Sequence, residues 1–137
     1  MAAHAEGSLT VVNSAHGHAE GSETIVDGTN GHAEGYATKA IGSCSHAEGC
    51  GTETSSYAGH VEGKYNITSD SINYLHIAGN GTNSNNRSNA YTLDWNGNGW
   101  YKGDLSFNGI MKMTEQMYGT ELPETGVEGQ LFFLVID

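Results

Sequence analysis

The tetrapeptide His-Ala-Glu-Gly recurs every fourteen residues in the first half of the chain, and this spacing restricts the fold more than any other feature. Copies begin at His4, His18, His32 and His46, and a variant copy, His-Val-Glu-Gly, begins at His60. A tandem repeat this short predicts a solenoid, in which each repeat forms one coil and buries its apolar face only against its neighbours. We number the positions of a coil from 1 at the histidine to 14.

Other positions of the coil also keep their residue types. Position 7 is Thr in four coils and Asn in the fifth, positions 8 and 9 are often β-branched, and position 11 is Ser, Gly or Asp. Each coil therefore predicts a strand, a turn at the tetrapeptide glycine, a second strand and a second turn at position 11. A coiled coil of two heptads has the same period, but each glycine inside a helix costs about 1 kcal/mol. The sequence favours an all-β fold of parallel coils.

Composition limits the partners and the size of the core. The formal net charge of the 137 residues is -11 with only five Lys and Arg, which argues against nucleic acid and against an anionic membrane surface. Coils of this length leave room inside only for small side chains, so a single solenoid is marginal, and we expect self-association. Cys44 and Cys50 suggest small buried residues rather than a disulfide or a zinc site. We expect no cofactor.

The second half of the chain departs from the repeat. The repeat is expected to end near Asp70, because His76 lies sixteen residues after His60 and is out of phase by two. These changes predict three regions, which are a β-roll at 1–75, a polar linker at 76–88 and a β-rich region at 89–137. The first complete coil starts at His4, and we expect its open edge to pair with another chain or an upstream partner, since bare strand edges aggregate.

Within the β-rich region we expect a hairpin and further short elements. Strands at 90–95 and 100–107 are joined by Asn-Gly-Asn-Gly, and Asn-Gly favours a two-residue turn whose central residues both need positive φ. The segment 110–118 fits either a short helix or a strand. A turn is expected at 122–126, and a strand that is buried on both faces is expected at 131–136, too short to cross a bilayer.

The histidines and glutamates of the tetrapeptides are the first candidate site. Residues two apart share one face of a strand, so we expect each His beside its own Glu and stacking to align both types in columns. Adjacent carboxylates at about 4.8 Å repel by about 3 kcal/mol at an effective dielectric of 20, which a neighbouring His relieves. We interpret the columns as a structural polar ladder, with Ala or Val on the opposite strand face; metal binding and acid/base catalysis are the alternatives. The ladder comprises His4, Glu6, His18, Glu20, His32, Glu34, His46, Glu48, His60 and Glu62.

Two further candidate sites lie in the hairpin. Asp94, Asn96 and Asn98 match the opening of a calcium-binding loop, but the twelfth position is Leu105 where a glutamate is required, so calcium is a weak option. Exposed aromatic rings suit sugars, which makes a glycan-binding surface of Trp95, Trp100 and Tyr101 possible. Alternating aromatic strand faces more often form a core or an interface.

The repeat has a family resemblance. The segment Ser-His-Ala-Glu-Gly-Cys-Gly-Thr at 45–52 resembles the fourteen-residue repeat of trimeric autotransporter adhesin heads. That resemblance implies a left-handed parallel β-roll, three chains packed side by side, and binding to host surfaces. The His-Ala-Glu-Gly variant looks like versions found in bacteriophage tail proteins. The segments 89–104 and 122–133 resemble pieces of phage tail fibres, so the resemblance covers most of the chain.

These resemblances imply a homotrimeric, non-enzymatic tail fibre or virion appendage that positions a surface for receptor binding or virion attachment. The receptor would be a host cell-surface glycan, and the location would be the virion. A bacterial surface adhesin head is the alternative, and a non-catalytic part of a glycan-degrading tail enzyme is another. The absence of an adhesin-type membrane anchor or coiled-coil stalk from the sequence favours the fibre.

Overall fold

The structure is a computed structural model that describes residues 2–69, 71–106, 108, 118–119 and 133–134. The chain forms two compact units, Met1–Leu105 and Ser106–Asp137. The first unit is a β-solenoid of about five turns, which confirms the all-β fold of stacked parallel coils. Among the described residues the only helical segment is a short 3₁₀-helix, η1, at Ser71–Asn73.

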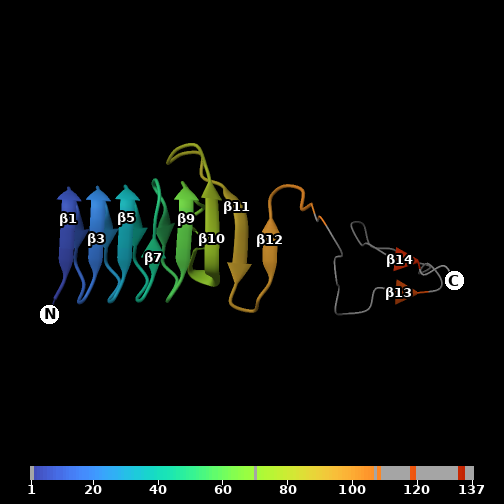
Figure 1. Cartoon of the computed structure of the whole chain (residues 1–137), viewed down its shortest axis with the longest axis horizontal. Helices are drawn as coiled ribbons and strands as arrows, with labels where there is room; N and C mark the ends of the chain where they lie inside the picture. Colours follow the sequence, from blue (N-terminus) through green and yellow to red (C-terminus); the bar gives the residue numbers. More distant parts are fainter. Residues whose placement is uncertain (1, 70, 107, 109–117, 120–132, 135–137) are drawn as a thin grey trace. The chain divides into compact units, whose positions relative to one another are not determined.

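Two sheets form the walls of the solenoid (Figure 1), and each of the first four coils contributes one strand to each sheet. In the large sheet, identical residues of successive coils pair in parallel register, for example His18 with His32. Its repeat strands are β1 (His4–Ser8), β3 (His18–Ser22), β5 (His32–Tyr36), β7 (His46–Ala47) and β9 (His60–Lys64). The small sheet consists of β2 (Val11–Val12), β4 (Ile25–Val26), β6 (Lys39–Ala40) and β8 (Glu53–Thr54).

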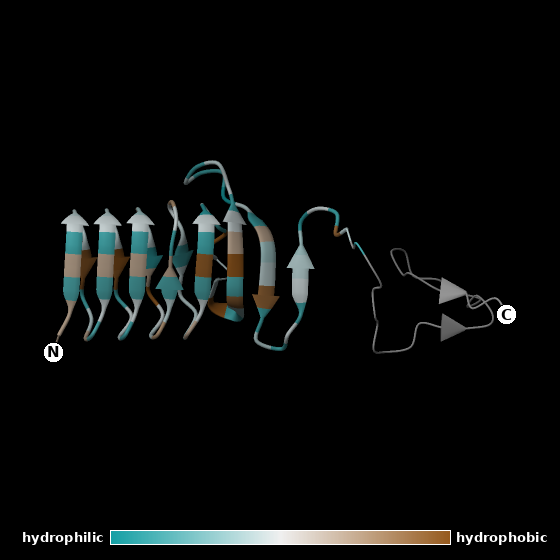
Figure 2. Cartoon of the chain, in the orientation of Figure 1, coloured by the Kyte–Doolittle hydropathy of each residue, from teal (hydrophilic) through white to brown (hydrophobic). Residues whose placement is uncertain are grey.

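The core between the two sheets is narrow and consists of small side chains. Position 2 of the tetrapeptide points inward, as expected, and Ala19, Ala33 and Ala47 are fully buried there. Position 7 is buried too, and its threonines form a polar row inside the coils. Figure 2 shows the result as continuous polar and apolar bands across the strands of the large sheet. The buried hydrophobic residues are Ala19, Val26, Ala33, Ala40, Ala47, Val61 and Ile77.

The tetrapeptide glycine does not form the turn that the sequence predicted. Gly35 lies within β5 with a φ of 102°, and a Cβ at this position would overlap the carbonyl oxygen of Gly49 in the next coil. The glycine is therefore required by the close approach of two backbones. The chain turns at positions 6 and 13, where mostly non-glycine residues adopt left-handed conformations. The non-glycine residues are Leu9, Glu23, Ala37 and Tyr65 at position 6, and His16, Asn30, Cys44 and Ala58 at position 13.

The large sheet continues past the predicted end of the repeat. Strand β10 (Tyr74–Asn80) pairs in parallel with β9, and His76 is in register with His60. The expectation that His76 is out of phase was wrong, because the two extra residues lie in the connection that contains η1. Ile77 then occupies the buried place of the repeat alanine. The predicted linker, 76–88, thus begins with residues of β10 and ends beside the following strand, within one compact unit.

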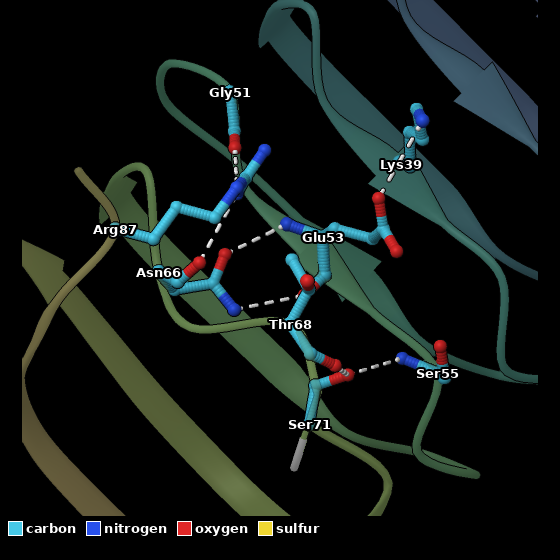
Figure 3. Close-up of polar contacts among 8 residues, drawn as sticks. All are labelled: Lys39, Gly51, Glu53, Ser55, Asn66, Thr68, Ser71 and Arg87. Carbon is cyan, nitrogen blue, oxygen red and sulfur yellow. Dashed lines mark hydrogen bonds and ion pairs between the residues drawn. The ribbon is translucent and has the colours of Figure 1, made fainter. Parts of the chain in front are cut away.

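The small sheet ends at β8, where side chains replace the next strand (Figure 3). The Asn66 side chain accepts a hydrogen bond from the Glu53 N–H at 2.8 Å and donates to the Glu53 carbonyl at 2.9 Å. The Ser55 N–H donates to the Ser71 hydroxyl at 3.3 Å. Arg87 donates to the carbonyl oxygens of Gly51 and Asn66. These contacts satisfy backbone groups that would otherwise be unpaired at the end of the sheet.

Two antiparallel strands complete the large sheet. Strand β11 (Asn89–Asp94) pairs with β10, and β12 (Gly99–Tyr101) pairs with β11, which confirms the predicted hairpin with a shorter second strand. Within its loop, all of which is described, only Gly97 has a positive φ, at 85°. The connection is therefore a three-residue loop with glycine in the left-handed position, not the expected two-residue turn.

The second unit is described at four strand residues. Strand β13 (Tyr118–Gly119) pairs in parallel with β14 (Phe133–Leu134). The strand expected at 131–136 therefore agrees with the structure at Phe133 and Leu134. Its burial, its other residues, most of 110–118 and the turn at 122–126 lie outside the described residues.

Candidate functional site

The candidate ladder lies on the outer face of the large sheet. Alternation along the strand places Ala33 in the core and directs His32 and Glu34 outward, where both are half-buried. The parallel register then repeats this arrangement from coil to coil. The ten predicted residues thus form two adjacent columns, one of histidines and one of glutamates, and His76 adds a sixth histidine that the sequence analysis missed.

The six imidazoles stack face to face. Ring centroids of consecutive histidines are 4.6–5.1 Å apart, and the planes of His18 and His32 differ by only 1°. The column continues into the hairpin, where Tyr91 meets His76 edge to face at 5.7 Å and Tyr101 packs on Tyr91 at 4.7 Å. One uninterrupted row of rings therefore crosses the large sheet, and its spacing is that of hydrogen-bonded strands.

The histidines pair with glutamates of the preceding coil. The Nε2 atoms of His32, His46, His60 and His76 lie 3.8, 3.6, 3.1 and 3.4 Å from a carboxylate oxygen of the glutamate in the preceding coil. The prediction that each His pairs with its own Glu is correct only for His4 and Glu6, at 3.8 Å. The His and Glu of one strand are two residues, or about 6.6 Å, apart, whereas neighbouring strands are only about 4.8 Å apart. The His and Glu side chains of successive coils therefore lean along the solenoid axis toward each other.

Most of these pairs are too long to be hydrogen bonds. The Nε2 atoms of His18, His32, His46 and His76 are buried and have no hydrogen-bond partner among the described residues. The exception is His60, whose Nε2 is hydrogen-bonded to Glu48. Burial, followed by repulsion from His32 and His60, lowers the pKa of His46, although nearby carboxylates oppose this shift. The lowered pKa favours the neutral imidazole of His46.

The column brings nitrogen and carboxylate donors into three compact groups. In each group, one possible ligand atom from each of three residues lies within 4.8 Å of the others. The groups are His4, Glu6 and His18; Glu20, His32 and Glu34; and Glu34, His46 and Glu48. The ladder can thus hold protons, cations or hydrogen-bonding partners along a face that is half-exposed.

A groove beside the hairpin is the second candidate site. Its volume is about 410 Å³, and it combines two aromatic side chains with hydroxyl, amide and carboxylate groups. The lining residues are Ile67, Tyr74, Asn89, Thr92, Asp94, Asn98, Gly99 and Trp100. Sequence reasoning identified Trp100 as a candidate but not its neighbours from the connection after β9, because only the pairing of β9, β10 and β11 brings them together.

The other aromatic candidates lie elsewhere. Trp95 is in the hairpin loop, and its indole N–H donates to the Ser56 hydroxyl at 3.1 Å. Tyr101 belongs to the ring column through its contact with Tyr91. The three residues predicted to form one glycan surface are thus distributed over three environments, and Trp100 alone lines the groove.

Asp94 organises the hairpin loop. One of its oxygens accepts the N–H groups of Asn96 and Asn98, and the other accepts the Asn98 side-chain amide, all at 2.8 Å. The hydrogen bond from the Asn98 side chain, followed by that from its backbone, lowers the pKa of Asp94. The three residues of the weak calcium option are therefore close together, but their contacts are those of an intramolecular turn.

The two cysteines are free thiols. Cys44 is exposed and Cys50 is half-buried, so the expectation that both are buried was wrong. They occupy positions 13 and 5 of consecutive coils and are not bonded to each other.

Comparisons of this chain with protein-family models, curated proteins and solved structures returned no match. Among the described residues, no helix is long and apolar enough to span a membrane.

Proposed function

We propose that this chain is a non-enzymatic part of a bacteriophage tail fibre or related virion appendage. Three copies form a rod that presents a surface for receptor binding or virion attachment. The observation that carries the proposal is the parallel stack from β1 to β10, which keeps its register from His4 to His76. Each coil adds one rung with the same residue types, which suits a spacer better than a catalyst.

The ladder face is our choice for the contact between chains. The core of one solenoid consists of small residues, chiefly Ala and Val, and such a core stabilises a thin rod poorly. The outer face of the large sheet carries His and Glu side chains, which in the middle coils are about one-third exposed, for example His46 and Glu34 at 36% and 34%. Histidine donates and glutamate accepts, so two such faces are complementary in hydrogen bonding.

The groove that contains Trp100 is our choice for a receptor surface, with a host cell-surface glycan as the ligand. Sugar rings stack on aromatic side chains, and their hydroxyl groups pair with amides and carboxylates. Trp100 is 53% exposed, which leaves its ring open to a ligand. Attachment to another fibre or virion protein would use the outer edge of β1, the end strand of the large sheet.

The assembly is tested by sedimentation equilibrium of the purified chain. We expect a particle of three chains, each of 14.5 kDa. A stable, folded monomer at micromolar concentration would contradict the trimer. Antibodies against the chain should label virion tails in the source culture, whereas labelling of the cell envelope alone would instead support a bacterial surface adhesin.

The receptor surface is tested on a panel of bacterial glycans. We expect binding that Trp100→Ala abolishes and that Tyr57→Ala, which removes an aromatic ring exposed elsewhere on the solenoid, leaves intact. Equal binding by both variants would exclude the groove. Release of reducing ends from the same glycans, lost in Glu48→Gln or Asp94→Asn, would contradict the non-enzymatic proposal.

A further inference from the structure

We propose that the ladder binds a late divalent transition metal of the zinc class, with Glu20, His32 and Glu34 as one ligand group. One possible ligand atom from each of these residues lies within 4.8 Å of the other two. An imidazole nitrogen with carboxylate oxygens is a ligand set that zinc accepts in proteins. The group is formed within one chain, so the inference does not depend on the trimer.

The spacing of the donors fits ligands better than hydrogen-bonding partners. In a tetrahedral site, zinc lies about 2.0–2.2 Å from nitrogen and oxygen, so two ligand atoms are about 3.3 Å apart. The nitrogen and oxygen atoms of a hydrogen bond are closer together, most often at about 2.9–3.0 Å. The Nε2 atom of His32 lies 3.8 Å from the Glu20 carboxylate, and that of His46 lies 3.6 Å from Glu34. Small side-chain rotations would bring each pair onto one ion.

The buried imidazole nitrogens are a second, independent observation. The Nε2 atom of His32 is shielded from solvent and has no hydrogen-bond partner in the described part of the chain. A buried polar atom without a partner is unfavourable, because it has lost its hydrogen bonds to water. The neighbouring histidines 18 and 46 share this property, whereas the Nε2 of His60 is already hydrogen-bonded. Three of the four unpaired nitrogens, those of His18, His32 and His46, therefore belong to residues of the ligand groups, and the fourth is that of His76.

The charges of the column also favour a cation. The glutamates of successive coils are paired in register, so each carboxylate repels the next. Among the described residues, every ion pair found for these carboxylates is with a histidine, not with Lys or Arg. A divalent ion offsets the repulsion, and the imidazole ligand favours zinc, nickel or copper over calcium and magnesium, which prefer oxygen.

Calorimetric titration of the metal-free protein with ZnCl₂, in millimolar Ca²⁺, tests this inference. We expect zinc binding that calcium does not displace. Glu34→Gln, which removes the carboxylate shared by two ligand groups, should weaken it by at least about tenfold. Glu20→Gln should weaken it less, because the group of Glu34, His46 and Glu48 remains. The matched control is Glu23→Gln, which removes an exposed carboxylate from the same coil as Glu20 and should leave the affinity unchanged. Absence of zinc binding, displacement by calcium, or equal weakening by Glu23→Gln would overturn the proposal.

A spectrum of the wild-type chain guards against variants that fail to fold. Co²⁺ in a tetrahedral site of nitrogen and oxygen ligands absorbs strongly in the visible range, and we expect those bands at one equivalent of CoCl₂. The weak absorption of hydrated Co²⁺ would overturn the inference. A metal-free monomer that binds zinc would refute the trimer alone, and a trimer that does not bind zinc would refute the metal site alone.

Discussion

The Nε2 atom of His46 lies 3.6 Å from the carboxylate of Glu34, one coil earlier, although Glu48 is the glutamate of its own coil. The His–Glu pairs therefore connect successive coils instead of two residues of one coil. A substitution in the middle of the column should disturb contacts with two coils, whereas one at the end should disturb contacts with one. The following predictions use such matched positions.

His32→Ala should lower the free energy of unfolding by about 1–3 kcal/mol, because it removes two ring stacks at about 0.5–1.5 kcal/mol each. His32 stacks on His18 at 4.8 Å and on His46 at 4.6 Å. The control is His4→Ala, which removes one stack from the exposed end of the column and should cost about half as much. Urea unfolding monitored by circular dichroism measures both. An unchanged midpoint for His32→Ala would contradict a structural role for the column.

Gly35→Ala should destabilise the chain much more than Gly97→Ala. Both glycines have a positive φ, 102° and 85°, which costs a residue with a Cβ about 1–2 kcal/mol. A Cβ at Gly35 also overlaps the carbonyl oxygen of Gly49, whereas nothing lies within 4 Å of one at Gly97. The overlap should add about 1–3 kcal/mol or more. Thermal unfolding of both variants checks this order, and equal losses would show that backbone conformation alone accounts for the tetrapeptide glycine.

Asn66→Ala should lower the free energy of unfolding by about 2–4 kcal/mol, because it leaves the Glu53 N–H and carbonyl groups without partners at about 1–3 kcal/mol each. Asn66→Asp keeps an acceptor for the N–H but loses the donor, so its loss should be intermediate. Asn85→Ala removes an exposed asparagine and should change little. Hydrogen exchange at the Glu53 amide gives a local measurement. Unchanged protection in Asn66→Ala would contradict the capping role.

The stability contributed by Asp94 should disappear in acid. Hydrogen bonds from Asn98 lower the pKa of the folded carboxyl, so the unfolded chain takes up this proton first as the pH falls. The contribution is therefore complete above the unfolded pKa of about 4 and is lost as the pH falls through the lower, folded value. The melting temperature of wild type should decrease relative to Asp94→Asn between about pH 5 and pH 2. Parallel melting curves over that interval would exclude this role.

Several features of the fold could be predicted from the sequence because they are local and periodic. The interval between His18 and His32 sets one coil, and alternation places Ala19 inside and both ladder residues outside. The left-handed corners at residues such as Glu23 and Asn30 could not be predicted, because neither is a glycine and the strain at each is compensated by contacts with adjacent coils. The groove could not be predicted from the sequence either, because Tyr74 and Trp100 come to line one groove only after β10 and β11 pair.

The repeat by itself determined that the chain winds into parallel coils with a histidine and a glutamate column on one face, because the period of a strand and the period of the sequence leave no other arrangement that buries the alanines. Only the tertiary structure decided that the sheet continues through His76, that Asn66 closes the small sheet, and that the histidines from His32 onward turn toward the glutamate of the preceding coil. These outcomes depend on distances between neighbouring rungs. Such distances exist only once the backbone hydrogen bonds have set the rungs about 4.8 Å apart.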